Sequence, residues 1–182
     1  MSYVGAGRLN QHLEVLELRE TAAGAWEWEA VRLAWAQVEQ TAKTNLFSKV
    51  GVGARDAAIV VRRQPLTLHQ ALRWKGRHLF LTSITDRDRN YLDVAAALVD
   101  LVDCRSEEGI RFPGVLTEKY AKWDQPEPYS VNHLTFVLVA PKGIRLQRGS
   151  LVAVEDVNYE VQVAHILDPY KNEYEIVRTE DL

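Results

Sequence analysis

Histidine and cysteine are the residue types in this sequence best suited to nucleophilic or metal-assisted chemistry. The five histidines are scattered along the chain, at His12, His69, His78, His133 and His165. None has a second histidine four residues away, the spacing with which a helix presents two ligands to zinc. The single cysteine, Cys104, is expected to be a small buried side chain and not a nucleophile. We predict no catalytic residue, no metal ligand and no cofactor site; a site assembled only in three dimensions stays open.

Short acidic and glycine motifs in the sequence do not complete a calcium-binding or phosphate-binding signature. Asp86-x-Asp88-x-Asn90 resembles the start of a calcium loop, but Tyr91 stands where the loop needs glycine and Ala97 where it needs glutamate. It is better interpreted as a hairpin turn. The segment 51–53, Gly-Val-Gly, is not followed by the Lys-Ser/Thr pair of a phosphate-binding loop, so a hinge is expected. The glutamate pairs 27/29 and 107/108 are expected to face solvent.

The sequence between Arg55 and Tyr91 contains eight basic residues and three acidic ones. The last third of the chain is acidic. Opposite charge on two parts of one chain favours head-to-tail contacts between copies, which close into rings when the rotation allows. Solvated strand faces are the plain alternative, and direct DNA contact is a weaker one. The candidate subunit or DNA contacts are Arg62, Arg63, Arg73, Lys75 and Arg77.

The composition is that of an ordinary globular protein. The chain has 182 residues, 47% hydrophobic and 26% charged, with a net charge of −3. This length allows one large domain or two small ones. A lone cysteine favours a reducing compartment over secretion. We expect neither a signal peptide nor a membrane span, because no stretch approaches about 18 apolar residues.

Apolar residues recur with period two along most of the chain, which predicts strands. Lys75-Gly76 is a hairpin signal between two such runs. The run 91–99 would also suit a helix, but its place after a polar turn favours a strand. Residues 41–56 form no clean strand, and we expect a short helix and a loop there. The proline- and glycine-rich stretch 105–130 is the best candidate for a linker.

A weak internal repeat joins the two halves of the chain. Residues 58–61, 65 and 72–81 match 135–138, 141 and 152–161 in order, and Asp86 and Tyr91 are matched with Asp168 and Tyr174. The second copy lacks an obvious counterpart of the first strands. We therefore predict a mainly β fold: a small antiparallel β-barrel or sandwich with a short helix or loop insertion in 1–104, a linker in 105–130, and a second, smaller, partial β-module in 131–182.

Residues 7–99 carry a series of short motifs whose order and spacing resemble the head-tail joining, or head-closure, proteins of long-tailed bacteriophages. The motifs are Gly7-Arg8-Leu9-Asn10, Trp28 ahead of Ala34-Trp35-Ala36-Gln37-Val38-Glu39, Ala58-Ile59-Val60-Val61-Arg62-Arg63, Leu72-Arg73-Trp74-Lys75-Gly76-Arg77-His78-Leu79-Phe80, Ile84-Thr85-Asp86 and Arg89-Asn90-Tyr91-Leu92. A typical member of that family would end near Cys104, so the C-terminal half departs from the pattern.

The resemblance implies a viral structural protein without enzymatic activity. Such a stopper or adaptor forms a homo-oligomeric ring, a hexamer or dodecamer, in the virion neck after assembly in the host cytoplasm. Its implied partners are further copies of itself, the portal or adaptor protein, a tail-completion or tail tube protein, and packaged DNA in the channel, with no membrane. The candidate channel loop comprises Asn45, Phe47, Lys49, Gly51, Gly53 and Arg55. The alternatives are a tail-completion or minor tail protein on the same module and a β-barrel nucleic-acid-binding module.

Overall fold

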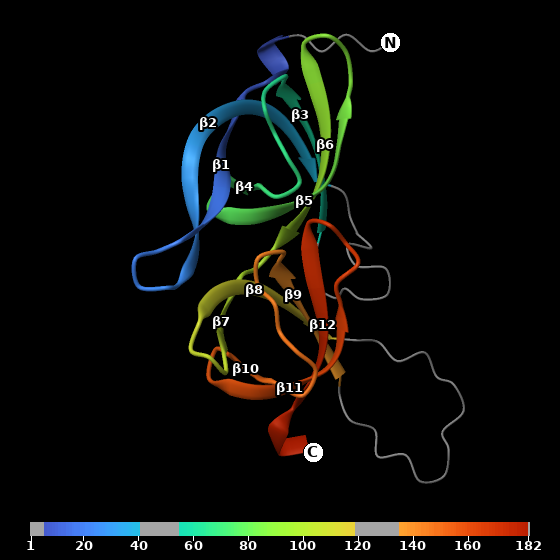
Figure 1. Cartoon of the computed structure of the whole chain (residues 1–182). Coiled ribbons are helices and arrows are strands. Elements are labelled where there is room, and N and C mark those ends of the chain that lie inside the picture. The colour runs from blue at the N-terminus through green and yellow to red at the C-terminus, as the bar shows by residue number, and fades with distance from the viewer. Residues whose placement is uncertain (1–5, 41–54, 119–134, 182) are drawn as a thin grey trace, which may run out of the picture. The chain divides into compact units, whose positions relative to one another are not determined.

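The computed structural model describes residues 6–40, 55–118 and 135–181 (Figure 1). These residues are mainly β-strand, with short 3₁₀ helices at Ala6–Arg8 and Thr179–Asp181. The prediction of a mainly β fold is confirmed. The chain divides into two compact units with a boundary between Asp100 and Leu101, and the hairpin tip Glu20–Trp26 is grouped with the second unit. No helix among the described residues is long and apolar enough to cross a membrane.

The first unit contains a closed antiparallel barrel, which we call barrel 1. Its strands are β1 (Gln11–Glu20), β2 (Trp26–Gln40), β3 (Arg55–Arg62), β4 (Ala71–Trp74), β5 (Arg77–Asp86) and β6 (Tyr91–Val99). Their order around the barrel is β1-β2-β3-β6-β5-β4. The predicted hairpin at Lys75-Gly76 is present, with both residues at positive φ, 52° and 78°. Such angles suit the tight turns whose twist matches that of paired strands. The run 91–99 is a strand, as predicted.

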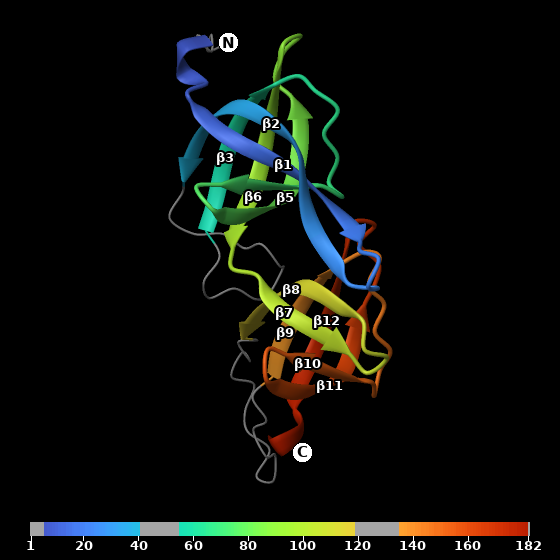
Figure 2. The ribbon, with the colours of Figure 1, turned by 90° about the vertical axis from the view of Figure 1, so that its left-hand side faces the viewer.

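The second unit contains a second closed barrel, which we call barrel 2 (Figure 2). Its strands are β7 (Val102–Ser106), β8 (Arg111–Glu118), β9 (Thr135–Pro141), β10 (Leu151–Val154), β11 (Val157–His165) and β12 (Lys171–Arg178). Their order is β10-β11-β12-β9-β8-β7. Closing the sheet pairs every strand on both sides, so neither barrel leaves an open edge for unwanted pairing.

The two barrels have one topology, because β1 to β6 correspond in order to β7 to β12. The registers correspond as well: Ile59 pairs with Val38 in barrel 1, and Leu138 with Leu116 in barrel 2. A register shift follows Leu81 in β5, and another follows Val161 in β11. The predicted duplication is therefore present, and it extends over six strands in each copy.

The expected alignment of the two copies is wrong in the third strand and at its end. Because Ile59 corresponds to Leu138, residues 58–61 correspond to 137–140 and not to 135–138, and Pro141 corresponds to Arg62 and not to Pro65. Asp88 accepts backbone hydrogen bonds from Asn90 and Tyr91, at 2.7 and 2.9 Å. Asp168 does the same for the residues two and three places after it, Tyr170 and Lys171. The counterpart of Asp168 is thus Asp88 and not Asp86, and the counterpart of Tyr91 is Lys171 and not Tyr174. The hydrogen bonds of the two turns define which residues correspond, whereas the shared tyrosine identity does not.

The expected linker at 105–130 and the partial module at 131–182 are also corrected. Strand β8 lies within the predicted linker and the end of β7 extends into it, and these two strands are the counterparts of β1 and β2 that the predicted second module lacks. The turn between them uses Gly109 at φ 85°. Gly114 lies inside β8, where an added Cβ would approach the Cys104 Sγ and Leu138 Cδ1 to 2.8 Å. Here the glycines and Pro113 serve a tight turn and close packing. Residues 119–130 lie outside the described residues.

Candidate interaction surfaces

His78 on β5 is a buried aromatic side chain in barrel 1. Its ring lies 5.1 Å from the Trp28 ring and 5.1 Å from the Phe80 ring, centroid to centroid. Burial, and then the positive charge of Arg73, lowers the pKa of His78 to about 3. The imidazole is therefore neutral at physiological pH. The nitrogens His78 Nε2 and Trp28 Nε1 are buried without a hydrogen-bond partner, which suits packing better than proton transfer.

Cys104 on β7 is buried in barrel 2, as expected. Burial, with the nearby carboxylates of Asp103 and Glu155, raises the pKa of the thiol to about 12. A nucleophilic cysteine needs the thiolate, which this site disfavours. The described residues contain no group of three His, Cys, Asp or Glu placed to hold a metal ion. The Asp86–Asn90 segment is a turn stabilised by Asp88, as predicted.

The predicted basic residues do not form a single patch. Arg62 pairs with Tyr91 at the start of β6, whereas His78, beside Arg77, pairs with Val99 at its end. The two groups therefore lie at different ends of barrel 1. Their charges are also largely paired with acids or packed on rings. Arg63 contacts Asp86 at 2.8 Å, Arg73 contacts Glu14 at 2.8 Å, Arg77 contacts Asp100 at 3.9 Å, and the Lys75 Nζ lies 4.6 Å from the centre of the Trp74 ring.

The candidate channel loop falls mostly outside the described residues. Asn45, Phe47, Lys49, Gly51 and Gly53 all lie there. Arg55 is the first residue of β3, is exposed, and pairs in register with Leu98 of β6.

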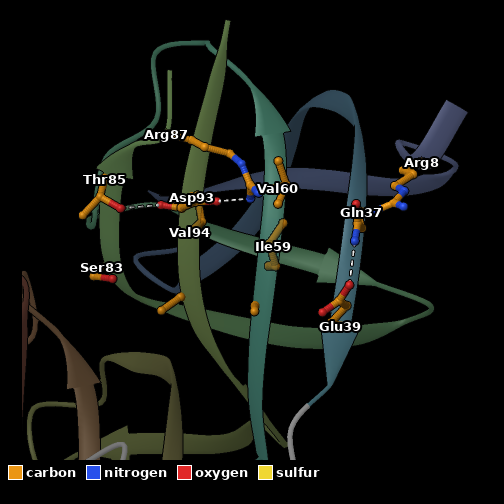
Figure 3. Close-up of a pocket in the computed structure, with 12 residues that line it drawn as sticks. Arg8, Gln37, Glu39, Ile59, Val60, Ser83, Thr85, Arg87, Asp93 and Val94 are labelled. Carbon is orange, nitrogen blue, oxygen red and sulfur yellow. Dashed lines mark hydrogen bonds and ion pairs between the residues drawn. The ribbon is translucent and has the colours of Figure 1, made fainter. Parts of the chain in front are cut away.

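A polar hollow of about 400 Å³ lies on barrel 1 over strands β2, β3, β5 and β6 (Figure 3). Arg87 and Asp93 form an ion pair of 2.9 Å in its lining, and the Gln37 Nε2 donates to the Glu39 Oε1 at 2.6 Å. The floor is made of small or aliphatic residues such as Ile59 and Val94, which Figure 3 shows between these polar side chains. In this hollow Arg87 is paired with Asp93 and Glu39 with Gln37, and the hydroxyl-bearing Ser83 and Thr85 have no histidine beside them in the described lining to activate them.

A second hollow of about 520 Å³ is more apolar. It is lined by Leu9, Leu33, Ala34, Trp35, Arg62 and Gln64. Leu33 and Trp35 project from the outer face of β2 and are 68% and 53% exposed. Ala34 and Ala36 are buried in the barrel interior. The alternation of residues 33–36 is visible in the sequence as period two. Apolar residues on both faces of this strand indicate a surface site, which the sequence reasoning missed.

Comparison with known proteins gives little similarity. No family model and no curated protein matches the chain. Among solved structures, a chain from the virion of a native gene transfer agent particle is similar, with 25% sequence identity and a TM-score of 0.38. The match covers 50% of this chain and 94% of that chain. A TM-score this low does not establish a shared fold.

Proposed function

We propose that this protein is a structural component of a bacteriophage virion, without enzymatic activity, that forms a ring in the neck between the capsid portal or its adaptor and the tail. In this role it helps to close the DNA exit channel after packaging. Its partners are further copies of itself, the portal or adaptor, a tail-completion or tail tube protein, and the packaged DNA.

One observation carries this proposal: the motifs that resemble head-closure proteins cover one complete folded unit. They begin at the 3₁₀ helix Ala6–Arg8, pass through β2, β3 and the β4–β5 hairpin, and end in β6. Matches that ran across a domain boundary would be weaker support for the resemblance. Here its extent, residues 7–99, coincides with barrel 1.

The physical properties of the described residues suit a scaffold that works by contact. Both sheets are closed, so the protein offers side chains and loops to partners instead of open strand edges. The Cys104 thiol and the His78 imidazole are held in their neutral forms. A ring resists load by repeating the same contact between subunits, and this needs no reactive group.

The proposal is tested on phage particles. With the gene deleted, we expect packaged heads and finished tails to accumulate unjoined, and the heads to lose their DNA. Supplying the protein from a plasmid should restore joining. Mass spectrometry and electron microscopy of wild-type particles should place it at the head-tail interface. Complete, infectious particles without the protein would refute the proposal, and a position on the tail side of the interface would favour a tail-completion or minor tail protein.

A further inference from the structure

The loop between β11 and β12 in barrel 2 presents apolar side chains to solvent. Leu167 is 97% exposed and its neighbour Ile166 is 57% exposed. The loop is held in place by Lys142, whose Nζ donates to the carbonyl oxygens of Ile166 and Asp168 at 2.7 and 2.6 Å and to the Asn172 Oδ1 at 2.9 Å. The apolar tip therefore projects from an ordered backbone, which lowers the entropy lost on binding.

Barrel 1 contains the same loop with a polar tip. Arg63 follows the end of β3 as Lys142 follows the end of β9, and its Nη2 donates to the carbonyl oxygen of Asp88 at 2.9 Å. The residues that correspond to Ile166 and Leu167 are Asp86 and Arg87, two before and one before the turn aspartate. The loop and its cation are thus compatible with a charged tip. The fold does not require the exposed leucine of barrel 2.

The apolar hollow of barrel 1 shows the reverse difference. Because Val38 corresponds to Leu116, Leu33 and Trp35 correspond to Arg111 and Pro113 of β8. The outer face of this strand therefore has an arginine and a proline in barrel 2 where barrel 1 has a leucine and a tryptophan. A large exposed leucine and tryptophan on one copy alone point to a binding surface and not to a need of the barrel.

We propose that the Ile166–Leu167 tip of one copy docks into the Leu33–Trp35 hollow of a second copy. The tip is apolar in barrel 2 and charged in barrel 1, and the hollow has two large apolar side chains in barrel 1 where barrel 2 has Arg111 and Pro113, so the contact between two copies is head-to-tail. Charge agrees with this: the exposed guanidinium of Arg62 lies in the hollow, and Asp168 follows the tip. Among the described residues of barrel 2, acidic side chains outnumber basic ones.

This contact deepens the proposed function and rests on it, because a ring needs one heterologous contact that every subunit repeats. One loop in one hollow buries little area, so the contact between free subunits is expected to be weak. Copies held side by side in a neck would then add the same contact around the ring.

The test uses the full-length protein and two charged variants, Leu167→Glu in the tip and Leu33→Glu in the hollow. Sedimentation up to millimolar concentration should show reversible self-association of the wild type. Each variant should weaken it at least about 10-fold. The matched control is Leu151→Glu, because Leu151 is an exposed apolar residue of β10 outside both surfaces, and it should associate like the wild type. Circular dichroism checks that all three variants stay folded.

Mixing the two variants sharpens the test. A Leu167→Glu protein keeps its hollow and a Leu33→Glu protein keeps its tip, so one intact contact forms between them. We expect complexes that stop at one copy of each and do not grow. Wild-type protein that stays monomeric throughout, or variants that fail to associate when mixed, would overturn the contact. If particles of the deletion strain nevertheless fail to join heads to tails, the proposed neck function survives and only this surface assignment is lost.

Discussion

Barrel 1 and barrel 2 have the same strand order but fill their interiors with different side chains. The core of barrel 1 is mainly aliphatic, with Leu13, Ile59, Leu81 and Leu98 among its buried members and Trp74 as an aromatic one. The core of barrel 2 contains aromatic and polar groups. Tyr174, the counterpart of Val94, donates its hydroxyl to the Ile144 carbonyl at 2.9 Å and accepts from the Leu146 N–H at 3.1 Å.

The difference shows how one topology tolerates two kinds of core. The larger Tyr174 and Phe136 occupy positions where barrel 1 has Val94 and Ala57. Barrel 2 offsets this volume with small neighbours, and Gly114 stands where barrel 1 has Ala36. Asn172 adds hydrogen bonds from its Nδ2 to the carbonyls of Lys142 and Ile144. A duplicated fold can thus keep its pairing while volume and polarity are exchanged within each core.

Replacing Tyr174 with alanine should have the largest effect and should confine it to barrel 2. The change removes a fully buried ring and leaves the Leu146 N–H without its acceptor, so we expect a loss of about 3–5 kcal/mol in the free energy of unfolding. Val94→Ala in barrel 1 is the matched control and should cost about 1–2 kcal/mol. Native-state hydrogen exchange, read separately on peptides of each barrel, measures both. Equal losses in the two barrels would show that the cores are not independent.

Acid should destabilise barrel 1 through His78. Its pKa of about 3 in the folded protein lies below the ordinary histidine value of 6.5, so the unfolded chain binds the proton more readily as the pH falls below 6.5. This lost stability amounts to about 1.4 kcal/mol per pH unit, or about 2 kcal/mol between pH 6.5 and 5. Urea unfolding at the two pH values, followed by tryptophan fluorescence, measures it. A His78→Phe variant should lose that part of the pH dependence.

Alkali should act on barrel 2 through Cys104. The folded thiol has a pKa of about 12 against an ordinary cysteine value of 9.0, so the stability is present below pH 9 and is lost as the pH rises toward 12. Cys104→Ala should remove this contribution, although it also leaves a small cavity. An alkaline loss of protection that appears first in barrel 1 would contradict this assignment.

Local patterns in the sequence predicted most of the strands, but they could not show which residues pair across long distances. Period two and the Lys75-Gly76 turn identified β4 and β5 directly. Pro113 and Gly114 suggested a linker, because the strand that contains them is defined by its pairing with β9, where Gly114 also packs closely against Leu138. The burial of His78 was likewise invisible, since alternation assigns it to a face without showing what packs on that face. The exposed Leu167 was missed because one apolar residue in a loop carries no period.

The smallest expected effect concerns Lys142 and Arg63, the two cations that hold the equivalent loops of barrel 2 and barrel 1. Lys142→Met removes two hydrogen bonds to the β11–β12 loop and one to Asn172 of β12. Arg63→Met removes those to the Asp88 and Arg89 carbonyls together with the Asp86 ion pair. Both cations lie close to solvent, so each change should cost only about 1 kcal/mol of stability. Their effects on self-association should differ, however. Loosening the apolar tip should weaken self-association about 3-fold, because the loop must then lose entropy on binding. Loosening the polar tip of barrel 1 should leave self-association unchanged. Sedimentation of both variants beside the wild type measures this, and equal weakening would show that the loop of barrel 2 has no special role in the contact between copies.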